Sequence, residues 1–180
     1  MRLQLTADSR VTIELRATGL LRAVGHEPTL VAAPEPMVLE VMQAAVPSQP
    51  IEVALDVVFR VDRIDPPADI GRSDRDRMRD NLRGAEVLDA KRFPTLSLHG
   101  SYRGSFEQGR LEGDLVIRGA RKPVEFDVRI ARAGGRLVAT GTWEGRLTEL
   151  GIRPFRALMG ALRLDDFLRL RVEASFDEPR

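Results

Sequence analysis

Apolar and polar residues alternate with a period of two along most of the chain, which is the pattern of strands with one buried face. In the longest run, from Ile51 to Val61, every second residue is apolar, whereas Glu52, Asp56 and Arg60 fall on the other face. Shorter runs repeat the pattern over residues 11–18, 96–99, 114–118, 124–130 and 168–176. Gly-containing breaks lie between many of these runs, so the chain is predicted to consist mainly of strands joined by turns.

Four segments depart from this alternation. Residues 74–83 are predicted to form a helix with Ser73 as its N-cap, because Asp76 and then Met78 follow at helical spacing. A second short helix is predicted for residues 155–162, where apolar side chains cluster. The segment 37–46 is apolar on both faces and is predicted to be a strand, whereas the Pro-containing stretch 62–72 is predicted to be a loop.

About eight antiparallel strands with one or two short helices point to an all-β protein, either a sandwich or a closed β-barrel. The helices do not alternate with the strands, which disfavours a doubly wound sheet. No linker is long enough to divide the chain, so residues 1–180 are expected to form one domain.

Composition removes several classes of function. The 180 residues include no Cys and two His, and the formal net charge is +1. Disulfide frameworks, cysteine nucleophiles and most metal centres are therefore excluded, and no basic surplus indicates a nucleic-acid partner. No stretch approaches the ~18 apolar residues of a membrane span. The first residues lack the apolar core of a signal peptide, so the expected location is the cytoplasm.

No catalytic motif is present, and neither a catalytic residue nor a cofactor is expected. His26 lies in a turn between apolar stretches, where its expected role is a hydrogen bond to the backbone. The alternatives are contact with a ligand head group, an axial haem ligand, or the general base of an enzyme that acts on an apolar substrate. His99 falls on the polar face of its strand and is expected to be exposed.

The expected inward faces carry the small residues Gly100, Gly113, Ala139 and Gly141. An eight-stranded barrel is just wide enough to be filled by side chains or to hold one small ligand. Small inward residues either leave volume for an elongated apolar ligand or serve strand bends and close packing. The pattern alone leaves both interpretations open.

Several segments then resemble the YceI-like family. They are Asn81–Gly84, Val87–Leu96, Leu111–Gly119 with Lys122-Pro123-Val124, Leu150-Gly151-Ile152 and Leu164-Asp165-Asp166, in this order over residues 73–176. The block Gly113-Asp114-Leu115 through Gly119 to Lys122-Pro123-Val124 is the most specific part. The resemblance implies a lipocalin-like antiparallel barrel that holds a polyisoprenoid or a similar amphiphile in its lumen, without catalytic residues.

On this basis the expected function is carriage or sequestration of a long apolar lipid. The alternatives are the enzyme or haem protein acting through His26, and a filled barrel that acts as an interaction module.

Arg75, Arg79 and Arg83 are expected to pair with nearby Asp residues, or else to meet a phosphate head group. The segment Phe155–Leu162 is expected to plug one barrel end, and a homodimer is left open. The residues expected at the lumen and its mouth are His26, Val53, Leu55, Val57, Phe59, Leu82, Leu98, Leu115, Ile117, Phe126, Trp143, Leu158 and Met159.

Overall fold

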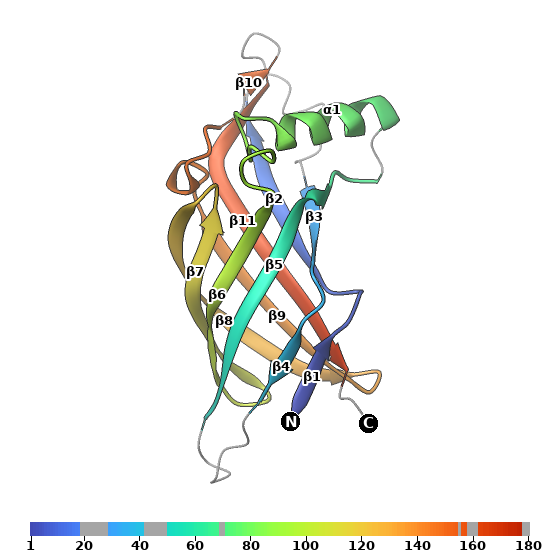
Figure 1. Ribbon diagram of the computed structural model, residues 1–180, viewed down its shortest axis with the longest axis vertical. Helices are drawn as coiled ribbons and strands as arrows, with labels where there is room; N and C mark the ends of the chain where they lie inside the picture. Colours follow the sequence, from blue (N-terminus) through green and yellow to red (C-terminus); the bar gives the residue numbers. More distant parts are fainter. Residues whose placement is uncertain (19–28, 42–49, 69–70, 155, 158–161, 178–180) are drawn as a thin grey trace.

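The computed structural model describes residues 1–18, 29–41, 50–68, 71–154, 156–157 and 162–177. Long strands wrap around a common axis, with the one α-helix of the described residues at one end and the N-terminus at the other (Figure 1). These are called the helix end and the N-terminal end. In chain order the elements are β1 (Arg2–Leu5), β2 (Arg10–Thr18), β3 (Thr29–Pro34), β4 (Val38–Glu40), β5 (Ile51–Asp65), α1 (Arg72–Arg83), β6 (Thr95–Gly104), β7 (Gln108–Ile117), β8 (Ala120–Ala133), β9 (Arg136–Gly145), the 3₁₀ helix η2 (Thr148–Leu150), β10 (Arg156–Ala157) and β11 (Leu162–Asp177).

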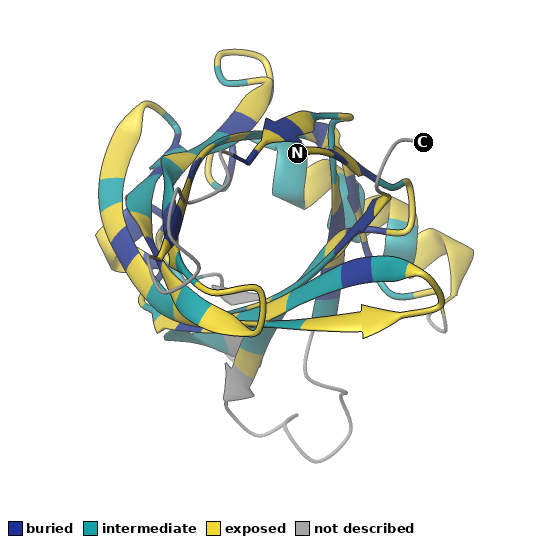
Figure 2. Ribbon diagram, turned by 90° about the horizontal axis from the view of Figure 1, so that it is seen from below, coloured by how far each residue is buried: buried dark blue, intermediate teal, exposed yellow. Residues whose placement is uncertain are grey.

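Eight strands close into a barrel in the order β2-β3-β5-β6-β7-β8-β9-β11, because β11 also pairs with β2. Each of these pairings is antiparallel, and the view along the axis shows the closed ring (Figure 2). The predicted barrel is therefore confirmed, and the sandwich is excluded. Three short strands are added to the ring: β1 pairs with the end of β11 and with β4, and β10 pairs with the start of β11.

The longest strand, β5, follows the predicted alternation at first and then changes phase. Ile51 and Val53 are buried two residues apart, but Val61 and Ile64 are both buried at a spacing of three. The register against β3 shifts in the same region, which is the mark of a bulge. The bulge lets β5 continue to Asp65, so the strand includes the first residues of the stretch predicted as a loop.

A tight turn explains one of the Gly-containing breaks. Arg118 and Gly119 both have positive φ, 52° and 76°, between the paired residues Ile117 and Ala120. Two consecutive residues with positive φ match the right-handed twist of the flanking strands. Gly119 meets this requirement without strain, because it lacks a Cβ atom.

The predicted helix over 74–83 is confirmed, but it begins earlier than expected. The N-cap of α1 is Gly71, which makes no side-chain capping bond, so Ser73 lies within the first turn rather than at the cap. The extended backbone of Gly71 starts the helix at Arg72, which is why the Ser73 signal is misplaced.

The second predicted helix is wrong for the residues that the structure describes. Arg156 and Ala157 form β10, which pairs with Arg163 and Leu162 of β11. A short apolar cluster fits either a strand or a helix, and main-chain pairing with a long neighbouring strand decides the outcome here. Similarly, the strand expected over 37–46 is present only as Val38–Glu40, and residues 42–46 lie outside the described part of the chain.

Candidate ligand cavity

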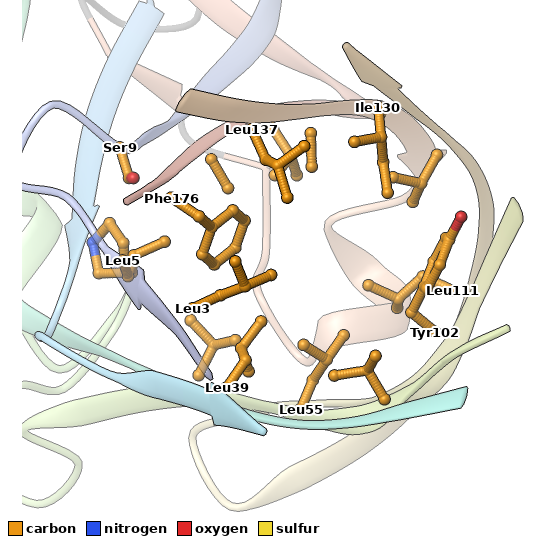
Figure 3. Close-up of a pocket in the computed structure, with 18 of the residues that line it drawn as sticks. Leu3, Leu5, Ser9, Leu39, Leu55, Tyr102, Leu111, Ile130, Leu137 and Phe176 are labelled. Carbon is orange, nitrogen blue, oxygen red and sulfur yellow. The ribbon is translucent and has the colours of Figure 1, made fainter. Parts of the chain in front are cut away.

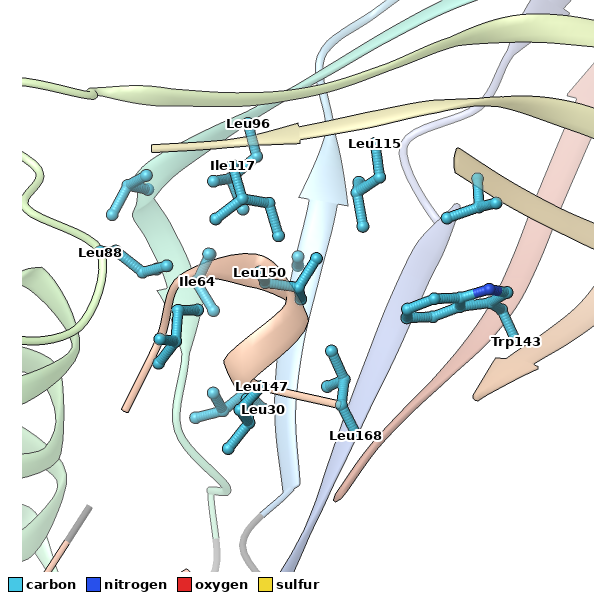
Figure 4. Close-up of a cluster of buried hydrophobic side chains, with 14 residues drawn as sticks. Leu30, Ile64, Leu88, Leu96, Leu115, Ile117, Trp143, Leu147, Leu150 and Leu168 are labelled. Atoms are coloured by element: carbon cyan, nitrogen blue, oxygen red, sulfur yellow. The ribbon is translucent and has the colours of Figure 1, made fainter. Parts of the chain in front are cut away.

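The interior of the barrel contains two clusters of apolar side chains, one near each end. The cluster near the helix end is closed by η2, whose Leu150 is only 1% exposed. Figure 4 shows Leu150 and Leu147 inserted among Leu30, Ile64 and Ile117 from the surrounding strands. Because η2 fills the lumen at this point, this half of the barrel is a packed core. We call it the packed cluster.

The other half of the barrel holds a cavity of about 150 Å³. Figure 3 shows Leu3, Leu55, Leu111, Leu137 and Phe176 directed into it from different sides. Its lining is almost entirely apolar. The lining side chains that come from the ring strands include Val53, Leu55, Val57, Phe59, Leu98, Tyr102, Leu111, Phe126, Val128, Ile130, Leu137, Ala139, Ala174 and Phe176.

The wall of the cavity is completed by the two short strands β1 and β4. Leu3 and Leu5 of β1 and Leu39 of β4 are buried and line the cavity, as does Val41, which follows β4. Sequence reasoning missed this contribution because each strand is too short for a clear alternating pattern. The available signal was the pair Leu3 and Leu5, with polar Gln4 between them.

The inward glycines do not create the empty volume. Gly100 and Gly113 face each other on β6 and β7, and a Cβ atom on Gly100 would come within 2.8 Å of the Cα of Gly113. A Cβ atom on Gly141 would lie 2.8 Å from the ring of Phe126, which already covers that position. Of the two interpretations left open by the sequence, close packing is therefore correct for these glycines. Ala139 and Gly141 do line the cavity, but Gly100 and Gly113 do not take part in its lining.

The candidate residues of the sequence analysis separate into three groups. Six of them, Val53, Leu55, Val57, Phe59, Leu98 and Phe126, line the cavity. Four others belong to the packed cluster instead: Leu115, Ile117 and Trp143 are buried in it, and Leu82 of α1 packs against it. His26, Leu158 and Met159 lie outside the described residues.

Charged groups at the cavity are paired with one another. Among the described lining residues, the ionisable carboxylate and guanidinium groups are those of Glu173 and Arg10, which lie 2.7 Å apart. The Tyr102 hydroxyl donates a hydrogen bond to the carbonyl oxygen of Ser105 at 2.5 Å. Burial raises the pKa of Tyr102, so its phenol stays neutral. The cavity therefore suits an uncharged chain.

The arginine row of α1 lies away from this cavity. Arg79 pairs with Asp65 at 2.8 Å and with Asp76 at 3.4 Å, and Arg83 donates to the carbonyl oxygen of Asp62. The inner side chains of α1 pack against the packed cluster, which separates the helix from the cavity. Ion pairing explains Arg79, and a phosphate head group of a ligand in this cavity would lie far from the row.

His99 connects two exposed side chains on the outer face of the barrel. Its Nδ1 lies 2.9 Å from Oδ1 of Asp56, and its Nε2 lies 2.7 Å from Oγ of Ser97. The order Ser, His, Asp is that of a hydrolase triad. However, the cavity lies on the opposite face of the sheet, and the strand ladder on both sides of Ser97 occupies the main-chain groups that an oxyanion hole would require. We interpret the three side chains as a surface hydrogen-bond network.

A closed antiparallel barrel with an apolar cavity in its lumen defines a lipocalin-like fold. The model of the YceI-like domain family matches residues 36–176, which is most of the chain. This protein therefore belongs to the YceI-like family, whose barrels generally bind apolar ligands and are generally not enzymes.

Solved structures show the same fold at low sequence identity. The crystal structure of BcnA from Burkholderia cenocepacia has a TM-score of 0.67 and 12% identity, and the match covers 94% of this chain and 96% of BcnA. A mutant YceI protein of Campylobacter jejuni, made for nanotechnology applications, has a TM-score of 0.54 and 14% identity, with 79% of this chain and 81% of that chain covered. No curated protein matches this chain. No helix among the described residues is long and apolar enough to cross a membrane.

Proposed function

We propose that this protein binds a long apolar lipid, such as a polyisoprenoid, in the cavity at the N-terminal end and carries or sequesters it. The observation that supports this function is the apolar cavity, where the charged side chains among the described lining residues, Arg10 and Glu173, are half exposed and paired with each other. An apolar lining without unpaired hydrogen-bonding groups favours burial of a hydrocarbon chain over a polar ligand.

The size of the cavity limits how much of the chain it holds in this conformation. A volume of about 150 Å³ is that of a cavity which stays dry and accepts a benzene-sized molecule, comparable with one isoprene unit. Burial of one such unit contributes about 4 kcal/mol, at roughly 0.8 kcal/mol per carbon. A dissociation constant near 1 μM requires about 8 kcal/mol. Tight binding of a long chain therefore requires burial of more of the chain than this volume holds, either at the open side of the cavity or in a cavity enlarged by movement of its lining.

Binding is tested by filling the cavity from one strand. Ala139 of β9 lines the cavity, whereas Thr142 of the same strand is exposed on the outer face. We expect Ala139→Phe to abolish retention of geranylgeraniol, measured by native mass spectrometry after incubation and gel filtration. Thr142→Phe is the matched control and should retain as much as the wild type. A wild-type protein that retains none, or an Ala139→Phe variant that retains as much as the control, would reject this function.

The enzyme and haem alternatives depend on His26, which lies outside the described residues, so the cavity gives them no support. An absorption spectrum of the purified protein tests for haem. The cytoplasmic location stays a prediction, which cell fractionation can check, and the homodimer stays open, which light scattering can decide.

A further inference from the structure

The wall of the barrel has a seam between β4 and β5. In the strand order β4 comes last: it pairs with β1 on one side, and no strand of the described residues pairs with its other side. On the side of the helix end, the seam is bounded by a main-chain hydrogen bond from the Glu35 amide to the Val58 carbonyl oxygen, at 2.8 Å. Towards the N-terminal end, β4 lies beside the first half of β5 without such a bond in the described part of the chain (Figure 1).

The direction of the main-chain groups supports this arrangement. In a strand, the amide and carbonyl of every second residue point to the same side. Because the Val58 carbonyl points to the seam, those of Glu52, Ala54 and Asp56 do so as well, while the residues between them point to β6. On β4, Met37 and Val41 bond to β1, so Val38 and Glu40 present their main-chain groups to the seam.

Strands β1 and β4 together form a two-stranded ribbon with limited attachment to the ring. Between β1 and β11 the register contains two pairs, Gln4 with Asp177 and Leu5 with Phe176. The turn that follows β1 is held to β11 at one residue: the Thr6 amide donates to the Ser175 carbonyl oxygen at 2.9 Å, and the Ser175 amide donates to the Ser9 hydroxyl oxygen at 3.0 Å. These contacts all lie along one edge, opposite the seam.

The ribbon also forms part of the wall of the cavity. Leu3 and Leu39 point into it from the two strands of the ribbon (Figure 3). Opening the barrel between β5 and β6 would break a ladder of ten register pairs. Opening it between β4 and β5 breaks no main-chain hydrogen bond of the described residues and separates only side-chain contacts. Separating the strands at the seam therefore costs fewer main-chain hydrogen bonds than separating β5 from β6 beside the same cavity.

We propose that the β1–β4 ribbon is a side door: an apolar lipid enters the cavity laterally, between β4 and β5, when the ribbon swings away about its edge on β11. This inference rests on the proposed function and extends it, because the same motion enlarges the cavity for a longer chain. A lateral opening allows the polar head of the lipid to remain in water while its chain slides between the strands.

The chain has no Cys, so an introduced pair of cysteines supplies the only thiols that a cross-linker can modify. Val38→Cys with Ala54→Cys places exposed thiols on both sides of the seam, and a short bismaleimide joins them. The control pair Ala54→Cys with Ser101→Cys joins β5 and β6 at positions that are already paired. Uptake of the uncharged fluorophore phenylnaphthylamine is followed by stopped flow. We expect bridging of the seam to slow uptake by about tenfold or more, while bridging of the control pair leaves it unchanged.

Uptake at the unbridged rate across a closed seam would overturn the side door while leaving the cavity as the binding site. If no variant takes up the probe at any time, the proposed function itself fails. Hydrogen exchange gives a second, independent measurement. The amides of Ala54 and Asp56 should exchange rapidly, whereas those of Val53 and Leu55, which face β6, should be protected. Equal protection of all four amides would show that the seam is paired in solution, and the side door would be wrong.

Discussion

A larger side chain lowers the free energy of unfolding where the core is filled and raises it where a cavity accepts the added atoms. Two alanines on inward faces allow this comparison. Ala139 lines the cavity, whereas Ala32 is 3% exposed within the packed cluster. Ala139→Leu adds three carbons, which occupy about 90 Å³ at roughly 30 Å³ each, a value close to that of a water molecule in the liquid. The cavity of about 150 Å³ accommodates them.

The expected gain follows from burial. Three buried carbons stabilise by about 2.4 kcal/mol. Fixing the rotamer of a leucine opposes this by about 0.5–1 kcal/mol. We therefore expect Ala139→Leu to raise the free energy of unfolding by about 1.5 kcal/mol, and Ala32→Leu to lower it by about 1–3 kcal/mol because the packed cluster must be displaced.

Urea denaturation measures both changes, provided that the slope of the free energy against denaturant stays the same in each variant. A loss of stability in Ala139→Leu as large as that in Ala32→Leu would show that the cavity collapses in solution, and the proposed binding site would fall with it. Stabilisation of both variants would contradict the division of the barrel into a packed half and a hollow half.

Three further perturbations test local features of the fold. Ser9→Ala removes the hydroxyl that bonds to the main chain of Ser175, so the buried amide loses its partner and we expect a loss of about 1–3 kcal/mol in urea denaturation. Gly145→Ala places a Cβ atom 2.2 Å from the ring of Trp143, the one tryptophan of the chain, so its fluorescence emission should shift to longer wavelength. Hydrogen bonds from the first residue of η2 hold the pKa of Asp166 below its usual value of 3.8, so the folded state is favoured above that value and η2 should loosen as the pH falls below about 4, which an NMR titration can follow.

The fold was accessible from the sequence because alternation reports directly which side of a strand is buried. Long strands such as β5 and β11 gave clear patterns, and one amphipathic helix stood apart from them. Short segments gave no such signal. The apolar cluster around Ala157 was compatible with a helix until its pairing with Leu162 was known, and β4 is only three residues long.

The position of the cavity was not accessible in the same way, because alternation does not distinguish a filled lumen from an empty one. Leu111 and Leu115 face inward on the same strand, β7, and their sequence patterns are equivalent. Yet Leu111 lines the cavity, and Leu115 is buried in the packed cluster. The difference comes from a residue outside the ring strands: Leu150 of η2 is buried in the same packed cluster as Leu115. The ring strands therefore define the container, while η2 and the β1–β4 ribbon decide which part of it is open to a ligand. Changes in the selectivity of such a barrel should thus be sought in these short elements before the long strands.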